Sequence, residues 1–247
     1  MNDTMAWAPL MAELDRWQAA GRIADLWLRD DDAVEPTLAL DRLLALTGEH
    51  DVPLTLAVIP EDTGAALAAC LDRAPWAEVA VHGWSHHNHA PATEKKQELG
   101  AHRPVDIVLG ELGAGFDKLA ALHKPRFVPM LVPPWNRIGT AVVSGLPDLG
   151  FKALSVFGAE KSGPLHLLNT HVDLMDWHGT RGGRDHGVLA TELAARLKLV
   201  FEQGGATGFL THHLVHDEQA WLFLETLLAL TKNHAGCRWR TAAALIL

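Results

Sequence analysis

The feature that most constrains the fold of this chain is a regular alternation of short apolar segments with longer segments of helical character. The short segments run for four to seven residues, which suits buried strands, and the helical ones run for ten to eighteen. Strands that alternate with helices are typical of βαβ units, in which parallel strands form a sheet that the helices cover. About seven such strands predict an α/β barrel or partial barrel.

The predicted elements follow one another without a linker, a low-complexity tract or an internal repeat. The predicted strands cover residues 23–29, 53–59, 78–81, 127–131, 152–156, 165–171 and 208–211. The predicted helices cover residues 4–20, 36–47, 61–73, 104–122, 140–149, 189–203 and 218–232. One α/β barrel is often of this size. We therefore predict a single domain over residues 1–247, in which residues 1–21 form an N-terminal helical extension.

Composition excludes several classes of protein. The net charge is −9, and no basic face stands out, so nucleic-acid binding is not expected. No run of 18 or more apolar residues is present, so no membrane span is expected. Cys70 and Cys237 lack CxxC spacing, and the first residues lack the pattern of a secretory signal. These features predict free thiols and a cytoplasmic protein, and they leave the oligomeric state open.

A cluster of charge, Arg29, Asp30, Asp31 and Asp32, directly follows the first apolar run. Three adjacent carboxylates repel one another, and a nearby cation would relieve the repulsion. In parallel α/β folds, the carboxyl ends of the strands carry the chemistry. A polar loop whose aspartates cap the next helix explains the cluster equally well, so the cluster alone does not indicate a site.

Four histidines lie within residues 82–89, directly after a predicted strand. His82 and His86 are four residues apart, and on a helical turn this spacing places both imidazoles on one face, as metal sites require. We expect His87 and His89 to be exposed or to lie behind the ligands. A lone histidine is usually a solvated or hydrogen-bonded residue, but four in one short segment favour a metal site.

Two further segments follow predicted strands. His212 lies in the sequence Leu-Thr-His-His, where a histidine can act as a general acid or can have a purely structural role. Residues 131–137 contain two prolines followed by Trp135 and Arg137. Such a stiff loop can present the indole as a flat wall for a ligand, or it can be an ordinary rigid loop.

All four segments follow a predicted strand, and in a parallel barrel the carboxyl ends of the strands lie on one face. We therefore expect carboxylate, imidazole and indole groups to meet there. Two histidines and one carboxylate leave part of a metal's coordination sphere open, which is typical of a catalytic metal site. The sequence predicts a divalent metal, with zinc the expected ion, bound by His82, His86 and one of the three aspartates.

The order of these motifs resembles that of the NodB-like polysaccharide deacetylases (carbohydrate esterase family 4), over most of the chain. The first motif of that family carries a catalytic base followed by a metal ligand. The resemblance implies these roles for Asp31 and Asp32, although a shift by one residue would give them to Asp30 and Asp31. The second motif supplies two histidine ligands, which His82 and His86 match.

The third motif of the family is matched less completely. It is usually Arg-Pro-Pro followed by an aromatic residue, and here Val132 occupies the position of the arginine, three residues before Trp135. In the family this arginine contacts the catalytic base. The resemblance therefore implies that Arg29 or Arg137 takes its place and keeps Asp31 ionised.

The fourth and fifth motifs complete the implied site. The fifth motif, Leu-x-His, implies that His212 is the general acid. The fourth motif is poorly defined, and its nearest match is the pair Asp176 and Trp177. The residues expected to bind the substrate or to support the base and the ligands are Arg29, Asp30, Trp84, Trp135, Arg137 and Asp176.

The resemblance implies a distorted (β/α)7-type barrel with a mostly parallel central sheet. It also implies a metal-dependent hydrolase that removes an N-linked acyl group, such as acetyl, from a carbohydrate or related amide. In this hypothesis Asp31 takes a proton from the attacking water and His212 protonates the leaving amine. The expected partner is a small-molecule or oligosaccharide substrate, and a cytoplasmic location favours a small soluble one.

Two other functions are compatible with the same motifs. One is a metal-dependent amidohydrolase or deformylase that acts on a small cytosolic amide with the same ligands. The other is a degenerate, non-catalytic barrel that binds a glycan or a protein. Val132, in the position of the arginine, favours this second alternative, whereas Asp31 and His212 disfavour it because a binding protein needs neither a base nor an acid.

Overall fold

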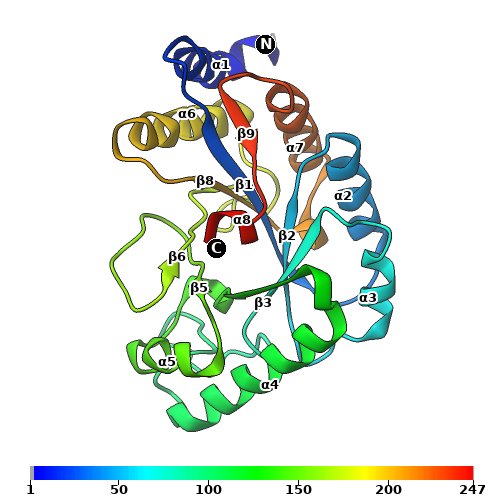
Figure 1. The fold of residues 1–247 in the computed structure, drawn as a ribbon, viewed down its shortest axis with the longest axis vertical. Helices are drawn as coiled ribbons and strands as arrows, with labels where there is room; N and C mark the ends of the chain where they lie inside the picture. The colour runs from blue at the N-terminus through cyan, green and yellow to red at the C-terminus, as the bar shows by residue number, and fades with distance from the viewer. Residues whose placement is uncertain (1–2, 247) are drawn as a thin grey trace.

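The computed structural model describes residues 3–246, and its strands form one parallel sheet. The strands are β1 (Ala24–Ala33), β2 (Leu54–Val58), β3 (Ala77–Val81), β4 (Phe127–Leu131), β5 (Ala153–Leu154), β6 (His166–Leu167), β7 (Val172–Asp173), β8 (Thr207–Thr211) and β9 (Cys237–Trp239). Their order is β6-β5-β4-β3-β2-β1-β8-β7, and β9 pairs with the first residues of β1. The sheet curls into a partial barrel (Figure 1), which confirms the predicted α/β fold class.

Helices surround the outside of the curled sheet (Figure 1). They are α1 (Asp3–Ala19), α2 (Leu38–Glu49), α3 (Ala65–Leu71), α4 (Val105–His123), α5 (Thr140–Gly145), α6 (His186–Gln203) and α7 (Glu218–Thr231). The short last helix, α8 (Ala243–Ile246), lies inside the barrel instead. The predicted N-terminal extension corresponds to α1, which packs beside α6, and residues 1–2 of it lie outside the described part of the chain. No described helix is long and apolar enough to cross a membrane.

Side-chain caps define the start of three of the helices. Thr37 accepts a hydrogen bond from the backbone N–H of Leu40 at the start of α2. Asp185 and Asp217 do the same at the starts of α6 and α7. Such caps satisfy N–H groups that have no partner within the helix, and each stabilises the protein by about 1 kcal/mol.

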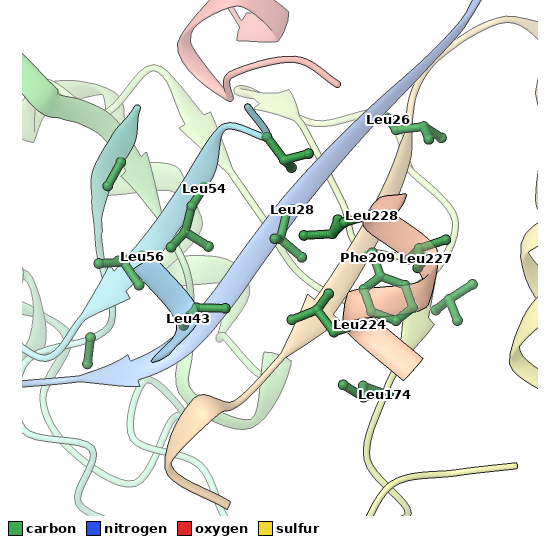
Figure 2. Close-up of a cluster of buried hydrophobic side chains, with 14 of the residues drawn as sticks. Leu26, Leu28, Leu43, Leu54, Leu56, Leu174, Phe209, Leu224, Leu227 and Leu228 are labelled. Atoms are coloured by element: carbon green, nitrogen blue, oxygen red, sulfur yellow. The ribbon is translucent and has the colours of Figure 1, made fainter. Parts of the chain in front are cut away.

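The alternation of side chains along β1 divides the core into an outer and an inner part. Leu26 and Leu28 point outward and pack, together with Phe209 of β8, against Leu224 and Leu228 of α7 (Figure 2). The side chains of the intervening positions point into the barrel, because successive residues of a strand face opposite sides of the sheet. The core between the sheet and the helices is the larger of the two.

The inner core is small and is closed by the C-terminal segment. Trp27 of β1 packs there against short side chains such as Ala57 and Ala80. Figure 1 shows α8 in the middle of the barrel, and α8 packs onto this cluster. Glu78, near the start of β3, accepts a hydrogen bond from the backbone N–H of Ala243. The segment therefore fills the end of the barrel where the strands begin.

Several predicted elements differ from the structure in extent. The first strand continues to Ala33 and includes all three aspartates, because the neighbours of β1 on both sides supply hydrogen-bond partners there. The predicted strand at residues 165–171 is replaced by the short β6 and β7, and the predicted helix at residues 61–73 shrinks to α3. β9 and α8 were not predicted, because segments of three or four residues carry too little periodicity.

Candidate metal site

The sequence motifs come together at one end of the sheet, because the parallel strands before them all end there. Asp32 belongs to the last part of β1, His82 directly follows β3, and His212 directly follows β8. Trp135 lies in a 3-10 turn (Pro134–Asn136) after β4. The shared strand end predicted from the sequence is therefore observed for each of these motifs.

The three adjacent aspartates of β1 have separate partners. Alternation along the strand places Asp31 on the same side as Arg29 and places Asp30 on the other side. Asp32 breaks the alternation, because its φ is +74° and the register of β1 against β2 shifts between Asp30 and Ala33. Aspartate tolerates a left-handed backbone better than most residues, and a bulge of this kind re-aims a side chain.

Asp32, His82 and His86 form the single group of potential metal ligands found among residues 3–246. Their ligand atoms lie within 4.8 Å of one another. Oδ1 of Asp32 is 3.0 Å from Nε2 of His82 and 3.3 Å from Nε2 of His86. His82 is buried, whereas Asp32 and His86 are half-buried, so solvent reaches the group.

The segment that carries the two histidines is a loop, so the predicted helical turn is wrong. The two imidazoles nevertheless meet, with ring centroids 5.1 Å apart. The loop turns through left-handed residues at Gly83 (φ +61°) and His86 (φ +59°). This conformation costs roughly 1–2 kcal/mol at a residue with a Cβ, and functional sites are where such strain is commonly held.

Hydrogen bonds and charges orient the ligand group. Nδ1 of His82 lies 2.9 Å from the carbonyl oxygen of Val132. When Nδ1 donates its N–H to this oxygen, the other ring nitrogen, Nε2, faces Asp32. Burial opposes protonation of His82, but the hydrogen bond to Asp32 and the nearby carboxylates raise the pKa of the imidazole. Burial also disfavours the carboxylate of Asp32, yet His82, His212 and His86 hold its pKa below the usual range.

Asp31 forms a buried ion pair with Arg29. Nε of Arg29 lies 2.9 Å from Oδ1 of Asp31, and Nη2 donates a hydrogen bond of 3.0 Å to Oδ2. Nη1 donates to Ser155 Oγ at 2.7 Å, and Nη2 also donates to Asn136 Oδ1 at 3.1 Å. Arg29 is completely buried. The guanidinium is thus fixed by groups from three segments of the chain.

His212 lies near a half-buried carboxylate, Asp173, at the end of β7. Burial raises the pKa of Asp173, and the charge of His212 opposes that effect. The indole Nε1 of Trp177 donates to Oδ2 of Asp173 at 2.8 Å, and the edge of the Trp177 ring meets the ring of His212 with centroids 4.7 Å apart. Asp173, His212 and Trp177 therefore form one cluster.

Asp30 holds the segment on both sides of His212. Its Oδ2 accepts hydrogen bonds from the hydroxyl of Thr211 at 2.6 Å and from the backbone N–H of His213 at 2.8 Å. Its Oδ1 pairs with Nδ1 of His213. All three residues are buried, so Asp30 connects β1 to the residues that flank His212 rather than to the ligand group.

The remaining predicted residues are divided between the site and the rest of the molecule. The ring of Trp135 lies 4.3 Å from that of His86. Trp84 instead packs beside α4, where a Cβ added at Gly115 would lie 3.5 Å from the indole. Arg137 donates to the carbonyl oxygen of Lys96, and Asp176 accepts from the backbone of residues 179 and 180 in a surface turn.

Sequence reasoning missed Asp173, Ser155, Asn136 and Glu98, all of which contact the residues described above. Asp173 ends a strand of two residues, too short to be recognised, although it lies in the same segment as Asp176 and Trp177. Asn136 lies inside the stiff loop that the sequence did single out. Nothing in the local sequence of Ser155 or Glu98 indicates that they lie at the site.

The ligand group fits a divalent metal ion. Two imidazoles and one carboxylate are a donor set that zinc and similar ions accept, and three protein ligands leave positions open for water or substrate. His82 is already oriented through its second nitrogen, as histidine ligands usually are. Asp32, which contacts both imidazoles, is the aspartate that fits this role.

Comparison of the sequence with known proteins gives no relative: no protein-family profile matches the chain, and no curated protein matches it. Comparison of the fold is informative. A candidate polysaccharide deacetylase from Mycobacterium smegmatis has a TM-score of 0.61 at 18% identity, over 91% of this chain and 88% of that one. The family 4 acetyl xylan esterase from Clostridium thermocellum, solved with cobalt, has a TM-score of 0.54 at 16% identity, over 90% and 89%.

The class that the fold and the site define is therefore a parallel α/β partial barrel with a potential metal site at the carboxyl end of its strands. Within this class, the chain has the NodB-like fold of the polysaccharide deacetylases and carbohydrate esterase family 4. A third similar structure is a mutant of a CE4 family pseudoenzyme with restored enzymatic activity (TM-score 0.60, 16% identity, 91% of this chain and 68% of that one). The fold alone therefore does not establish activity.

Proposed function

We propose that the chain is a metal-dependent hydrolase that removes an N-linked acyl group, such as acetyl, from a carbohydrate or a related amide. The observation that carries the proposal is the group of Asp32, His82 and His86, together with a second carboxylate, Asp31, that pairs with Arg29 and whose charge acts on His82. A base next to an open ligand group is what hydrolysis of an amide requires. The deacetylases and the esterase with the same fold support this reaction.

Asp32, His82 and His86 would hold the ion, for which we propose zinc. A bound ion of this kind supplies Lewis-acid polarisation of the acyl carbonyl and of water. The left-handed backbone at Asp32 and His86 directs their ligand atoms toward one another and toward His82. Because the ring of Trp135 packs against His86, the indole also restricts the position of that ligand.

Asp31 is the proposed general base. The water oxygen forms a bond to the acyl carbon, and Asp31 takes the proton that this oxygen loses. Arg29 balances the charge of Asp31 and fixes its orientation, because Arg29 is itself held by Ser155 and Asn136. The carboxylate is therefore held in one geometry, and its charge acts on His82.

His212 is the proposed general acid. When the bond between the acyl carbon and nitrogen breaks, the leaving amine gains a proton from His212, and the products are a free carboxylic acid and an amine. Trp177, whose indole donates a hydrogen bond to Asp173, packs edge-on against the imidazole. Asp30 keeps the backbone on either side of His212 in place.

The test is release of acetate from N-acetylated oligosaccharides by protein stripped of metal and then supplied with zinc or cobalt. The wild type should be active only with metal. Asp31→Asn should keep its metal and lose at least about 100-fold in kcat, because the base is removed while the ligands remain. His86→Ala should lose both metal and activity. Stoichiometric zinc retained by His86→Ala would show that the ligand assignment is wrong.

Two other functions are separated by the same experiment. Formyl and acyl derivatives of small amides, run beside the oligosaccharides, identify an amidohydrolase of small substrates. A non-catalytic glycan-binding barrel would release no product from any substrate at any metal concentration. Val132, in the place of the arginine, is the observation that favours this last function, but Arg29 provides Asp31 with a buried guanidinium from another position.

A further inference from the structure

A buried glutamate outside every motif contacts the loop that carries the histidine pair. Glu98 is 1% exposed, and no basic side chain is among its hydrogen-bond donors. Its Oε1 accepts from the backbone N–H of Ser85 at 2.7 Å, from the Ser85 hydroxyl at 3.0 Å and from the backbone N–H of Trp84 at 3.2 Å. All of these donors lie between His82 and His86.

The segment around Glu98 also contacts the loop after β4. The backbone N–H of Gly139 donates to the carbonyl oxygen of Leu99 at 2.8 Å, and Arg137 donates to that of Lys96 at 2.8 Å. Residues 96–99 therefore link the loop with the two histidines to the loop with Trp135. The ring of Trp135 packs against His86, so both linked loops contact the same ligand.

The packing around Glu98 is tight. A Cβ added at Gly83 would lie 2.1 Å from Oε2 of Glu98 and 2.7 Å from Cγ of Pro134. The carboxylate thus occupies the space inside the turn that begins after His82. Because this turn ends at His86 with a left-handed backbone, the loop has a costly conformation that something must hold.

The geometry points to Glu98 as a positioning residue that sets the metal affinity of the site by holding the loop of residues 82–86. A buried carboxylate is costly to desolvate, and here that cost is offset by hydrogen bonds from the loop alone. Without the hydrogen bonds to Glu98, the loop that carries His86 would have to be ordered when the ion binds. The negative charge of Glu98 also acts on the imidazole of His86. This inference rests on the proposed metal site.

Three variants separate the contributions of Glu98. Glu98→Leu removes both the hydrogen bonds and the charge. Glu98→Gln keeps a carbonyl oxygen at the Oε1 position and removes the charge, together with the weaker contact of Oε2 with the backbone N–H of Trp84 at 3.3 Å. Ser85→Ala leaves the carboxylate and removes two bonds of the hydroxyl, the one it donates to Glu98 and the one it accepts from the backbone N–H of His87. The matched control is Glu13→Leu, which removes another buried glutamate, bonded to Arg16 within α1 on the outside of the barrel.

The measurement is the dissociation constant for zinc, obtained by competition with a chelator, on full-length protein whose fold is checked by circular dichroism. Glu98→Leu should weaken zinc binding by at least tenfold, as removal of groups that orient ligands usually does. Glu98→Gln should lie between it and the wild type, and Ser85→Ala should weaken binding about threefold. Glu13→Leu should lower thermal stability and leave the dissociation constant unchanged.

Folded Glu98→Leu protein that binds zinc within twofold of the wild type would overturn the inference while leaving the metal site intact. If Glu98→Leu does not fold, the decision passes to Glu98→Gln and Ser85→Ala, and wild-type affinity in both would overturn it equally. Failure of the wild type to bind zinc or cobalt would instead overturn the proposed function, and the inference with it. The two failures are therefore distinguishable.

Discussion

Arg29 and Asp31 form a buried ion pair within a single strand, two positions apart. Alternation along β1 places both side chains on the same side of the sheet, so the contact requires no loop. Ser155 and Asn136 accept hydrogen bonds from Nη1 and Nη2 of the guanidinium. Removal of one member of a buried charge pair leaves the charge of the other uncompensated.

Removal of one member of this pair should be costly for folding as well as for activity. Arg29→Met should lower the free energy of unfolding by about 3 kcal/mol, because it leaves the buried charge of Asp31 unpaired. Urea unfolding at pH 7 measures the effect. The double variant with Asp31→Asn should regain much of the loss, and a purely additive double variant would show that the two residues are not coupled.

The separate directions of the three aspartates could be predicted only in part. The alternation of side chains along a strand explains why Asp30 and Asp31 point to opposite sides of the sheet. The direction of the Asp32 side chain depends on a bulge against β2 that no local sequence pattern indicates. The choice of Arg29 over Arg137 depends on contacts with Ser155 and Asn136, which are distant in the chain. The spacing of the motif identified His82 and His86 as candidates. It did not indicate that Glu98 accepts hydrogen bonds from the loop that joins them.

Among the elements, α4 ends at a histidine that is buried without a partner. His123 is 1% exposed, and neither ring nitrogen has a hydrogen-bond partner among residues 3–246. Burial, with a smaller contribution from the charge of Arg126, lowers the pKa of the imidazole from 6.5 to about 4. The end of α4 therefore accepts this ring only in its neutral form.

Protonation of His123 should destabilise the fold in mild acid. The folded state binds its proton less tightly than the unfolded chain, so the full stability is present above pH 6.5 and declines as the pH falls toward 4. Between pH 7 and pH 5 this amounts to about 2 kcal/mol. His123→Leu should remove this dependence from urea unfolding curves. Leu119→Ala, in the same helix, should lower stability equally at both pH values.

The helices predicted from the sequence agree closely with the structure where they are long and have a periodic apolar pattern. The predicted helices at residues 4–20, 104–122 and 218–232 match α1, α4 and α7 within one residue at each end. The strands between β5 and β7 were predicted less well. Each has two residues, and its position depends on pairing with neighbouring strands rather than on its own composition.

In the whole molecule, the parallel sheet separates two ends with different roles. The candidate site lies where the strands end, and α8 fills the barrel where they begin. The predicted position of the motifs at one face followed from the parallel arrangement alone. The closure by α8 could not be predicted, since its four residues carry no helical pattern of their own.

Metal binding should stabilise the whole fold, because its three ligands come from β1 and from the loop after β3. Free zinc at 100 times its dissociation constant should raise the free energy of unfolding by about 2.7 kcal/mol. Thermal melts with and without zinc measure this, with chelator as the reference. His86→Ala should show no shift, and a shift of the same size in that variant would place the ion elsewhere.

The ion pair within β1 restricts the routes by which such a site can evolve. In the family that the motifs resemble, the arginine next to the base occupies the position of Val132, which here is buried in the inner core. An arginine at position 132 would place a second cation in the buried interior while Arg29 is present, and loss of Arg29 alone would leave the charge of Asp31 unpaired. Either single step is strongly unfavourable. We therefore expect an arginine at position 132 to be tolerated only when Arg29 is replaced at the same time.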